Sequence, residues 1–325
     1  MGLSFGKPVI AKVAGYGWVV MVTSGYNNGA GDGRGHLFVI NARTGTLIAD
    51  VATSAGSAGS PSGLGQISAF ADNAQLDATT NAAYGGDLMG NVWKFKLEGD
   101  KATWVALKIA TLTDDSGSVQ PVTTAPELST ISTNAGAKRV IFVGTGKLLS
   151  GSDIGDTSIQ SFYALVDDQS AAPLISSPRT MLQLNTVTVS GTDRHVSGTV
   201  DYRNKRGRYM DLPGAGERVS SDPAGAFGAI IFTANQPSSQ GCSSNSYLYA
   251  ISMVSGAELS PTPGAPSLAG QLIGQALASR PVVVVTSTGK VRVLAHESND
   301  TVANVAPPIS ASNPAKRTAW KEISR

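Results

Sequence analysis

The sequence predicts an all-β fold, a modified β-propeller of seven blades, with six as the alternative and with long surface loops. Short apolar runs alternate with turn signals along the whole chain, and we find no amphipathic helical pattern. Glycine accounts for 37 of the 325 residues, while charged residues make up only 15%. Ordinary soluble proteins contain about 25% charged residues, so this composition is typical of a turn-rich β-protein.

A repeated unit indicates blades. It consists of a small residue, alternating apolar residues and often a turn ending in glycine, and copies begin at Gly35, Gly90, Ser161, Ser246 and Gly289. The first two copies and the last two are roughly 40 to 55 residues apart, which suits blades of several strands. More apolar runs at 18–22, 140–143, 229–232 and 281–285 are expected near the propeller axis, where neighbouring blades cover both faces of a sheet. The least regular region is 183–210.

The segment Tyr-Gly-Gly-Asp-Leu-Met-Gly-Asn-Val-Trp-Lys-Phe predicts the inner hairpin of one blade. Gly85 and Gly90 permit backbone angles that other residues resist. Asp87 can accept hydrogen bonds from turn amides, and this structural role is preferred for it. Trp93 and Phe95 fall on one strand face because they are two residues apart, which predicts blade packing.

The bulk properties exclude some partners. A net charge of +2 gives nucleic acid little attraction, and no apolar run approaches the about 18–20 residues of a membrane span. Cys242 is the sole cysteine, so it can pair only with a partner or with a cysteine outside this chain. The start, residues 1–7, lacks a signal-peptide pattern. We expect a single domain over 1–325, the C-terminal fragment of a longer secreted, extracellular protein.

Several segments in a fixed order carry a family resemblance. They are 25–28 (Gly-Tyr-Asn-Asn), 84–95, 120–126, 142–147 with Asp153, 161–167, 211–219, 232–242 and the closing 320–323. Together they resemble the C-terminal propeller domain of the PilY/PilC family of type IV pilus biogenesis factors and tip adhesins. The resemblance implies a non-enzymatic module at the pilus tip or outer-membrane surface. It would act with minor pilins and the pilus machinery, oppose pilus retraction, and contribute to adhesion to host or abiotic surfaces, twitching motility and virulence.

The resemblance also implies a calcium loop just before the Tyr-Gly-Gly-Asp turn. Mapped by spacing, its ligands would be Asn73, Gln75, Asp77, the Thr79 carbonyl and Asn81. Calcium takes about six to eight oxygens, several of them carboxylates, and only Asp77 is charged on this register. Either calcium binds weakly here, or a metal-free loop is held by amide hydrogen bonds.

Other polar residues offer little sign of catalysis. Asp114 and Asp153 lie in turns that could offer oxygens to a cation, but as solvated turns they need none. His36, His195 and His296 are widely separated and lack a metal-ligand spacing. These features predict that the protein is not an enzyme.

Two alternative functions stay open. Residues 87–93 approximate the docking pattern of propellers that use pyrroloquinoline quinone, although the spacing from Gly90 to Trp93 is one residue short and the pattern occurs once. The vicinal cysteines of those dehydrogenases have no counterpart here. A glycan-binding adhesive propeller would need only exposed aromatic side chains.

Overall fold

The computed structural model describes residues 1–72, 77–169, 175–238, 244–260 and 267–309. Within these ranges the chain forms β-strands, two short 3-10 turns (Lys101–Thr103 and Gly151–Asp153) and one α-helix, α1 (Pro178–Met181). The predicted all-β class is confirmed.

The strands form five sheets, which we call blades 1 to 5 in chain order. Blade 1 contains β1 (Val9–Val13), β2 (Gly17–Thr23), β3 (His36–Asn41) and β4 (Leu47–Ala52), with β6 (Thr79–Thr80) parallel to β1. Blade 2 contains β5 (Ile67–Phe70), β7 (Ala82–Gly86), β8 (Asn91–Lys96) and β9 (Val105–Thr111). Blade 3 contains β10 (Glu127–Thr133), β11 (Gly136–Gly144), β12 (Ser161–Asp167) and β16 (Gly207–Asp211), with β13 (Gln183–Leu184) parallel to β16.

The last two blades depart further from a plain four-stranded sheet. Blade 4 contains β17 (Ala224–Ala226), β18 (Ala229–Gln236), β19 (Asn245–Ser252) and β20 (Gly270–Gly274), and the hairpin β14 (Thr186–Ser190) to β15 (Asp193–Ser197) extends its outer edge. Blade 5 contains β21 (Val282–Val285), β22 (Val291–His296) and β23 (Val302–Val305).

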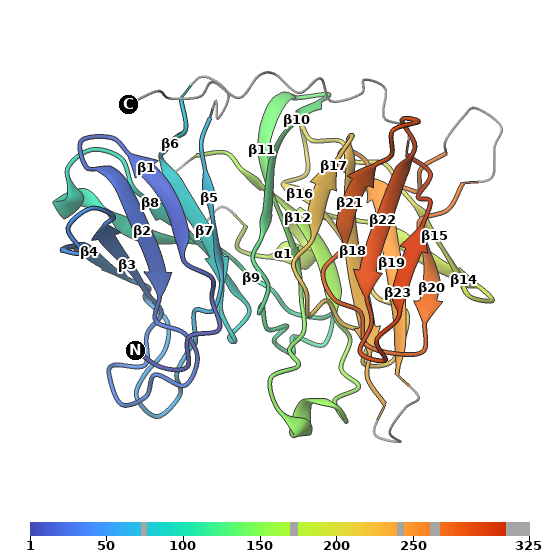
Figure 1. Cartoon of the computed structure of the whole chain (residues 1–325), viewed down its shortest axis with the longest axis horizontal. Helices are drawn as coiled ribbons and strands as arrows, with labels where there is room; N and C mark the ends of the chain where they lie inside the picture. Colours follow the sequence, from blue (N-terminus) through green and yellow to red (C-terminus); the bar gives the residue numbers. More distant parts are fainter. Residues whose placement is uncertain (73–76, 170–174, 239–243, 261–266, 310–325) are drawn as a thin grey trace.

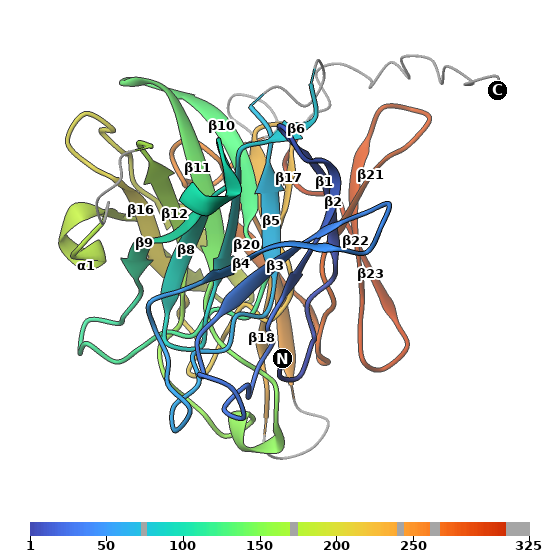
Figure 2. The ribbon, with the colours of Figure 1, turned by 90° about the vertical axis from the view of Figure 1, so that its left-hand side faces the viewer.

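The blades are arranged radially. Their first strands, β1, β5, β10, β17 and β21, lie next to one another in that order. The strands that follow in each blade pair antiparallel away from them, apart from the short parallel strands β6 and β13. Figure 1 shows blade 1 at the left, blades 2 and 3 after it, and blades 4 and 5 overlapping at the right, and Figure 2 gives the view from the left-hand side. The predicted propeller architecture is thus confirmed.

The number of blades differs from the prediction. The described residues form five blades rather than seven or six. Each of the five repeated units supplies strands to one blade, whereas the irregular region 183–210 builds no blade of its own. Instead β16 completes blade 3, and the β14–β15 hairpin adds to blade 4.

The position of the most apolar strands also differs from expectation. Of the four runs predicted near the axis, only 281–285 lies in an innermost strand, β21. The runs 18–22, 140–143 and 229–232 belong to β2, β11 and β18, which are second strands. The innermost strands β10 and β17 are less buried than β11 and β18. These apolar runs lie where neighbouring blades pack together, because neighbouring blades cover both faces of the second and third strands.

Hydrophobic layers fill the spaces between successive blades. Blades 1 and 2 share a layer around Met21 and Trp93, and blades 2 and 3 share one around Tyr84 and Ile141. Between blades 3 and 4, the rings of Phe162 and Phe232 stack with centroids 4.0 Å apart. A smaller layer around Ile231 and Val293 joins blades 4 and 5. Every blade is therefore held by its neighbours.

The predicted hairpin is present as the β7–β8 connection of blade 2, but it joins the second and third strands and not the innermost ones. Asp87 is fully buried, and its Oδ1 accepts hydrogen bonds from the amides of Met89 and Asn91, both at 2.9 Å. Its Oδ2 accepts from Asn91 Nδ2 at 2.9 Å and from Trp93 Nε1 at 2.8 Å. Burial raises the pKa of Asp87 above its ordinary value, although these hydrogen bonds oppose the rise.

The two glycines of this hairpin are needed for different reasons. Gly90 has φ +73°, as the turn requires. Gly85 does not lie in the left-handed region, so the reason predicted for it was wrong. A Cβ at Gly85 would lie 2.7 Å from the carbonyl oxygen of Gln66 and 2.8 Å from a methyl carbon of Ile67. Close packing against the β5 segment excludes a side chain there.

We predict that Asp87→Ala lowers the free energy of unfolding by about 3 kcal/mol, because it leaves buried donors without an acceptor. The measurement is equilibrium denaturation followed by tryptophan fluorescence. The control is Asp114→Ala, in which an exposed turn carboxylate is removed. Equal effects of the two substitutions would contradict the role assigned to Asp87.

Candidate functional site

The predicted calcium loop is described only in part, since Asn73 and Gln75 lie outside the described residues. Oδ1 of Asp77 accepts hydrogen bonds from Thr79, at 3.0 Å from its amide and 2.6 Å from its hydroxyl. The same oxygen lies 3.3 Å from Lys12 Nζ. The bonds to Thr79, followed by the contact with Lys12, lower the pKa of Asp77 below its ordinary value.

Asn81, the last residue predicted as a calcium ligand, contacts a different carboxylate. Its Nδ2 donates to Oδ2 of Asp72 at 2.5 Å. Thus the structure does not bring Asp77 and Asn81 to a common partner. Among the residues that the structure describes, no group of three His, Cys, Asp or Glu side chains could hold a metal ion. Calcium binding stays a prediction.

The two turn aspartates are engaged by their own loops. Asp114 accepts hydrogen bonds from the amides of Ser116 and Ser118, both at 2.9 Å. Asp153 is buried and accepts from the amides of Leu149 at 2.8 Å and Ser150 at 2.9 Å. Both aspartates thus lie in turns, as predicted, but Asp153 is buried and not solvated as expected.

No local sequence pattern indicates that His36 lies between two carboxylates. Its Nδ1 lies 2.7 Å from Asp50 Oδ1, and its Nε2 lies 3.0 Å from Asp32 Oδ1. Arg34 Nε approaches Asp32 at 4.0 Å. Burial lowers the pKa of His36, but the hydrogen bonds to Asp50 and Asp32 outweigh this effect and raise its pKa above the ordinary value. An imidazole can donate to both carboxylates only when both of its nitrogens are protonated.

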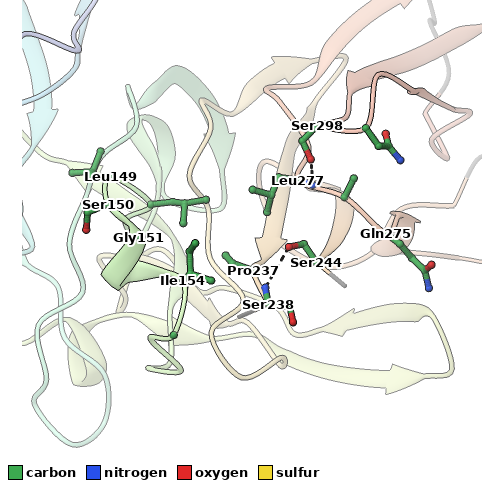
Figure 3. A pocket seen from close by; sticks show the side chains of 14 residues that line it. Leu149, Ser150, Gly151, Ile154, Pro237, Ser238, Ser244, Gln275, Leu277 and Ser298 are labelled. Carbon is green, nitrogen blue, oxygen red and sulfur yellow. Dashed lines mark hydrogen bonds between the residues drawn. The ribbon is translucent and has the colours of Figure 1, made fainter. Parts of the chain in front are cut away.

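A groove at one end of the propeller, among the described residues, has a volume of about 960 Å³. Connections of blades 3, 4 and 5 form its walls (Figure 3). The lining residues are Leu148, Leu149, Ser150, Gly151, Ile154 and Gly155 after β11, Pro237, Ser238 and Ser244 between β18 and β19, Gln275, Ala276 and Leu277 before β21, and Ser298 and Asn299 after β22.

The described side chains that line the groove are all uncharged. None of the described residues that line it is charged or aromatic. Leu149, Ile154 and Leu277 offer aliphatic surface, and serine, glutamine and asparagine side chains offer neutral polar groups. Leu149 and Ile154 are 40% and 38% exposed, so apolar area is available to a partner. A surface of this kind can bind an uncharged, apolar segment of another protein.

Arg218 fixes the wall that carries Leu149 and Ile154. Its guanidinium donates to the carbonyl oxygens of Lys147 at 2.9 Å and Asp153 at 2.7 Å, and also to that of Asp156. Burial lowers the pKa of Arg218. In the sequence, Lys147 and Arg218 stood out only as family markers, and Asp153 as a family marker and a turn residue. The groove was missed because four segments far apart in the sequence create it.

Taken together, these features define a class: a bladed β-propeller with a neutral, preorganised groove formed by its loops. A model of the PilY1 beta-propeller domain matches residues 1–188. The chain belongs to this family of type IV pilus biogenesis factors.

Individual relatives agree with this assignment. The chain is 30% identical over 348 aligned residues to a type IV pilus biogenesis factor PilY1 homolog of Xylella fastidiosa, which covers 100% of this chain and 27% of that protein. It is 29% identical over 192 residues to PilY1 of Pseudomonas aeruginosa PAO1, covering 52% of this chain and 16% of that protein. The chain thus spans about a quarter or less of these relatives.

One solved structure supports the fold. The crystal structure of the Pseudomonas aeruginosa PilY1 C-terminal domain superposes with a TM-score of 0.77 and 19% sequence identity, covering 95% of this chain and 73% of that one. Within the described residues, no helix is long and apolar enough to cross a membrane.

A pH-dependent contribution to stability follows from the His36 contacts. Because the pKa of His36 is raised in the folded chain, the stabilisation is fully present below the ordinary histidine pKa of about 6.5 and is lost as the pH rises through the folded-state pKa. We predict that His36→Gln destabilises the chain more at acidic pH than at alkaline pH. The measurement is the change in Tm caused by His36→Gln, determined by thermal unfolding at an acidic and at an alkaline pH.

The control for this prediction is a chain carrying both Asp32→Asn and Asp50→Asn. In that background the effect of His36→Gln should become independent of pH over the same interval. If His36→Gln destabilised the otherwise wild-type chain equally at acidic and alkaline pH, the proposed protonation of His36 would be refuted.

Proposed function

We propose that this chain is a non-enzymatic docking module that supports type IV pilus assembly. In this proposal it acts at the pilus tip or outer-membrane surface, binds minor pilins, opposes retraction, and so contributes to adhesion and twitching motility. Membership of a family whose curated relatives are named type IV pilus biogenesis factors supports the pilus role. The observation that carries the docking mechanism is the neutral groove of blades 3 to 5.

The groove favours one kind of partner. Its aliphatic residues gain free energy when apolar surface covers them, at about 25 cal/mol per Å². Because charged side chains are missing from its described lining, it offers no ion pair to a charged ligand. The Arg218 contacts hold one wall in place before binding, which lowers the entropy lost on association. An uncharged, apolar surface segment of a minor pilin is the occupant that matches these properties.

The alternatives find less support. The Asp87 carboxylate, which suggested a quinone-docking pattern, is fully engaged in closing its own hairpin. Glycan binding usually relies on aromatic stacking, and the described lining of the groove contains no aromatic ring. A quinone titration followed by absorbance and a glycan array test these two functions directly.

We predict that Leu149→Asp combined with Ile154→Asp abolishes the contribution of this domain to twitching, because buried unpaired carboxylates oppose docking of an apolar partner. The assay is complementation of twitching in a strain lacking the full-length factor. Full-length protein carrying the double substitution is compared with the unaltered protein and with a form lacking this domain.

The matched control is Val189→Asp, which changes a similarly exposed aliphatic residue on β14, outside the groove. This variant should restore twitching fully. Normal twitching with the groove variant, at equal protein level, would show that docking uses another surface. Quinone-dependent oxidation by the unaltered protein would instead support the dehydrogenase alternative.

A further inference from the structure

The loop that the family resemblance assigns to calcium contains only two carboxylates in this chain. Between Ala71 and Asn81 these are Asp72 and Asp77. The residues at 73–76, which the structure does not describe, are Asn, Ala, Gln and Leu, so they add no charge. Any divalent cation here would depend on these two carboxylates. Their contacts therefore decide whether the site suits calcium.

Asp72 is already paired with a cation from the next blade. Arg139 of β11 reaches across from blade 3, and its Nη2 donates to Oδ1 of Asp72. The guanidinium carbon lies 4.0 Å from the ring centre of Phe70, which packs under it. The other carboxylate oxygen of Asp72 accepts from Asn81 at 2.5 Å. Both oxygens thus have protein partners.

The pair continues into a buried network. Arg139 Nη1 donates to the hydroxyl of Tyr84 at 3.0 Å, and this hydroxyl donates to Asp167 Oδ2 at 2.5 Å. Lys94 Nζ lies 2.7 Å from the same oxygen of Asp167. Burial, followed by the nearby Asp167, raises the pKa of Tyr84 far above its ordinary value, so the hydroxyl remains a donor.

The network is electrically balanced. Lys94 and Arg139 carry positive charge, and Asp72 and Asp167 carry negative charge. The side chains of Lys94, Arg139 and Asp167 are 7%, 4% and 0% exposed, so water screens their charges weakly. A calcium ion at Asp72 would add two positive charges beside Arg139. It would also have to displace Arg139 from the carboxylate.

Asp77 is held on the other side of the loop. Lys12 of β1 approaches it at 3.3 Å, and β6 pairs in parallel with β1 directly beside this contact. Both side chains are about half exposed, and such pairs contribute little energy alone. Lys12 nevertheless places a positive charge beside Asp77, where a bound metal ion would otherwise supply it. The two carboxylates are thus drawn to blades 3 and 1 by different cations.

We propose that Arg139 and Lys12 act as built-in cations that take the place of calcium in this chain, and that they fasten the loop between blades 1 and 3 without a metal. This differs from the weak calcium site that the resemblance implies. Calcium needs about six to eight oxygens with several carboxylates among them, whereas both carboxylates of this loop are already committed to side-chain cations. The contacts of Asp72 and Asp77 would therefore not depend on external calcium.

The first test is a titration of the chelator-treated chain with calcium chloride alone. Isothermal titration calorimetry should detect no binding tighter than about 1 mM, and the Tm should change by less than about 1 °C between chelator and about 1 mM calcium. Binding tighter than about 10 μM that disappears in Asp77→Asn would overturn the proposal.

The second test removes the built-in cation. Arg139→Gln should lower the Tm by about 5 °C, since it breaks a buried network. Because Asp72 then lacks a cationic partner and keeps only the bond from Asn81, calcium should raise the Tm of this variant and not that of the wild type. Arg203→Gln is the matched control, as this arginine is 69% exposed and its loss should change little.

Two results would contradict the proposal that Arg139 takes the place of calcium. One is an Arg139→Gln chain as stable as the Arg203→Gln control. The other is an Arg139→Gln chain whose Tm does not change when calcium is added. If Arg139→Gln does not fold, Arg139→Lys retains the charge and should fold with an intermediate Tm and no response to calcium. The calcium titration of the wild-type chain tests for tight calcium binding whether or not the Arg139→Gln and Arg139→Lys variants fold.

Discussion

The structure depends on burial of each blade against the next. In blade 3, every residue of β12 is buried, and so are the last six residues of β11. A sheet covered on both faces loses contact with water along its whole length, so both rows of side chains must be apolar or fully hydrogen-bonded. The stacked rings of Phe162, Phe232 and Tyr249 meet this requirement between blades 3 and 4.

This packing leaves the loops to carry function. The blade strands are fixed by their neighbours, so the connections at one end can form a groove without weakening the core. Polar groups that the loops bury are matched individually: the Arg218 guanidinium by carbonyl oxygens, and the Asp153 carboxylate by backbone amides. The ion network of Arg139 and Asp167 joins blades 2 and 3 in the same way, through groups that satisfy one another.

Much of the fold could be predicted from local sequence. The alternation around Trp93 and Phe95 and the turn chemistry of Asp87 and Gly90 depend on residues close in the chain, and the structure has the hairpin that they predict. The described residues form fewer blades than predicted because β16 joins β12 across an irregular segment, and no local pattern encodes that pairing. Long-range strand order is set by packing of whole blades.

The site was less accessible to sequence reasoning for the same reason. The contact of Asp72 with Arg139 and the position of His36 between Asp32 and Asp50 depend on sheet register and loop path. The groove needs loops from three blades, and each loop alone appears as an ordinary Ser- and Gly-rich connection. Spacing located the oxygen-bearing loop before β7 but could not show that cations of other blades contact its carboxylates.

The most direct test of the central claim is the stability of the aromatic layer between blades 3 and 4. Phe232 is fully buried there, whereas Phe227, five residues earlier, is 41% exposed. Equilibrium denaturation should show that Phe232→Ala lowers the free energy of unfolding by about 4 kcal/mol, while Phe227→Ala changes it by less than about 1 kcal/mol. Similar small losses for both variants would show that packing between blades does not hold the propeller together.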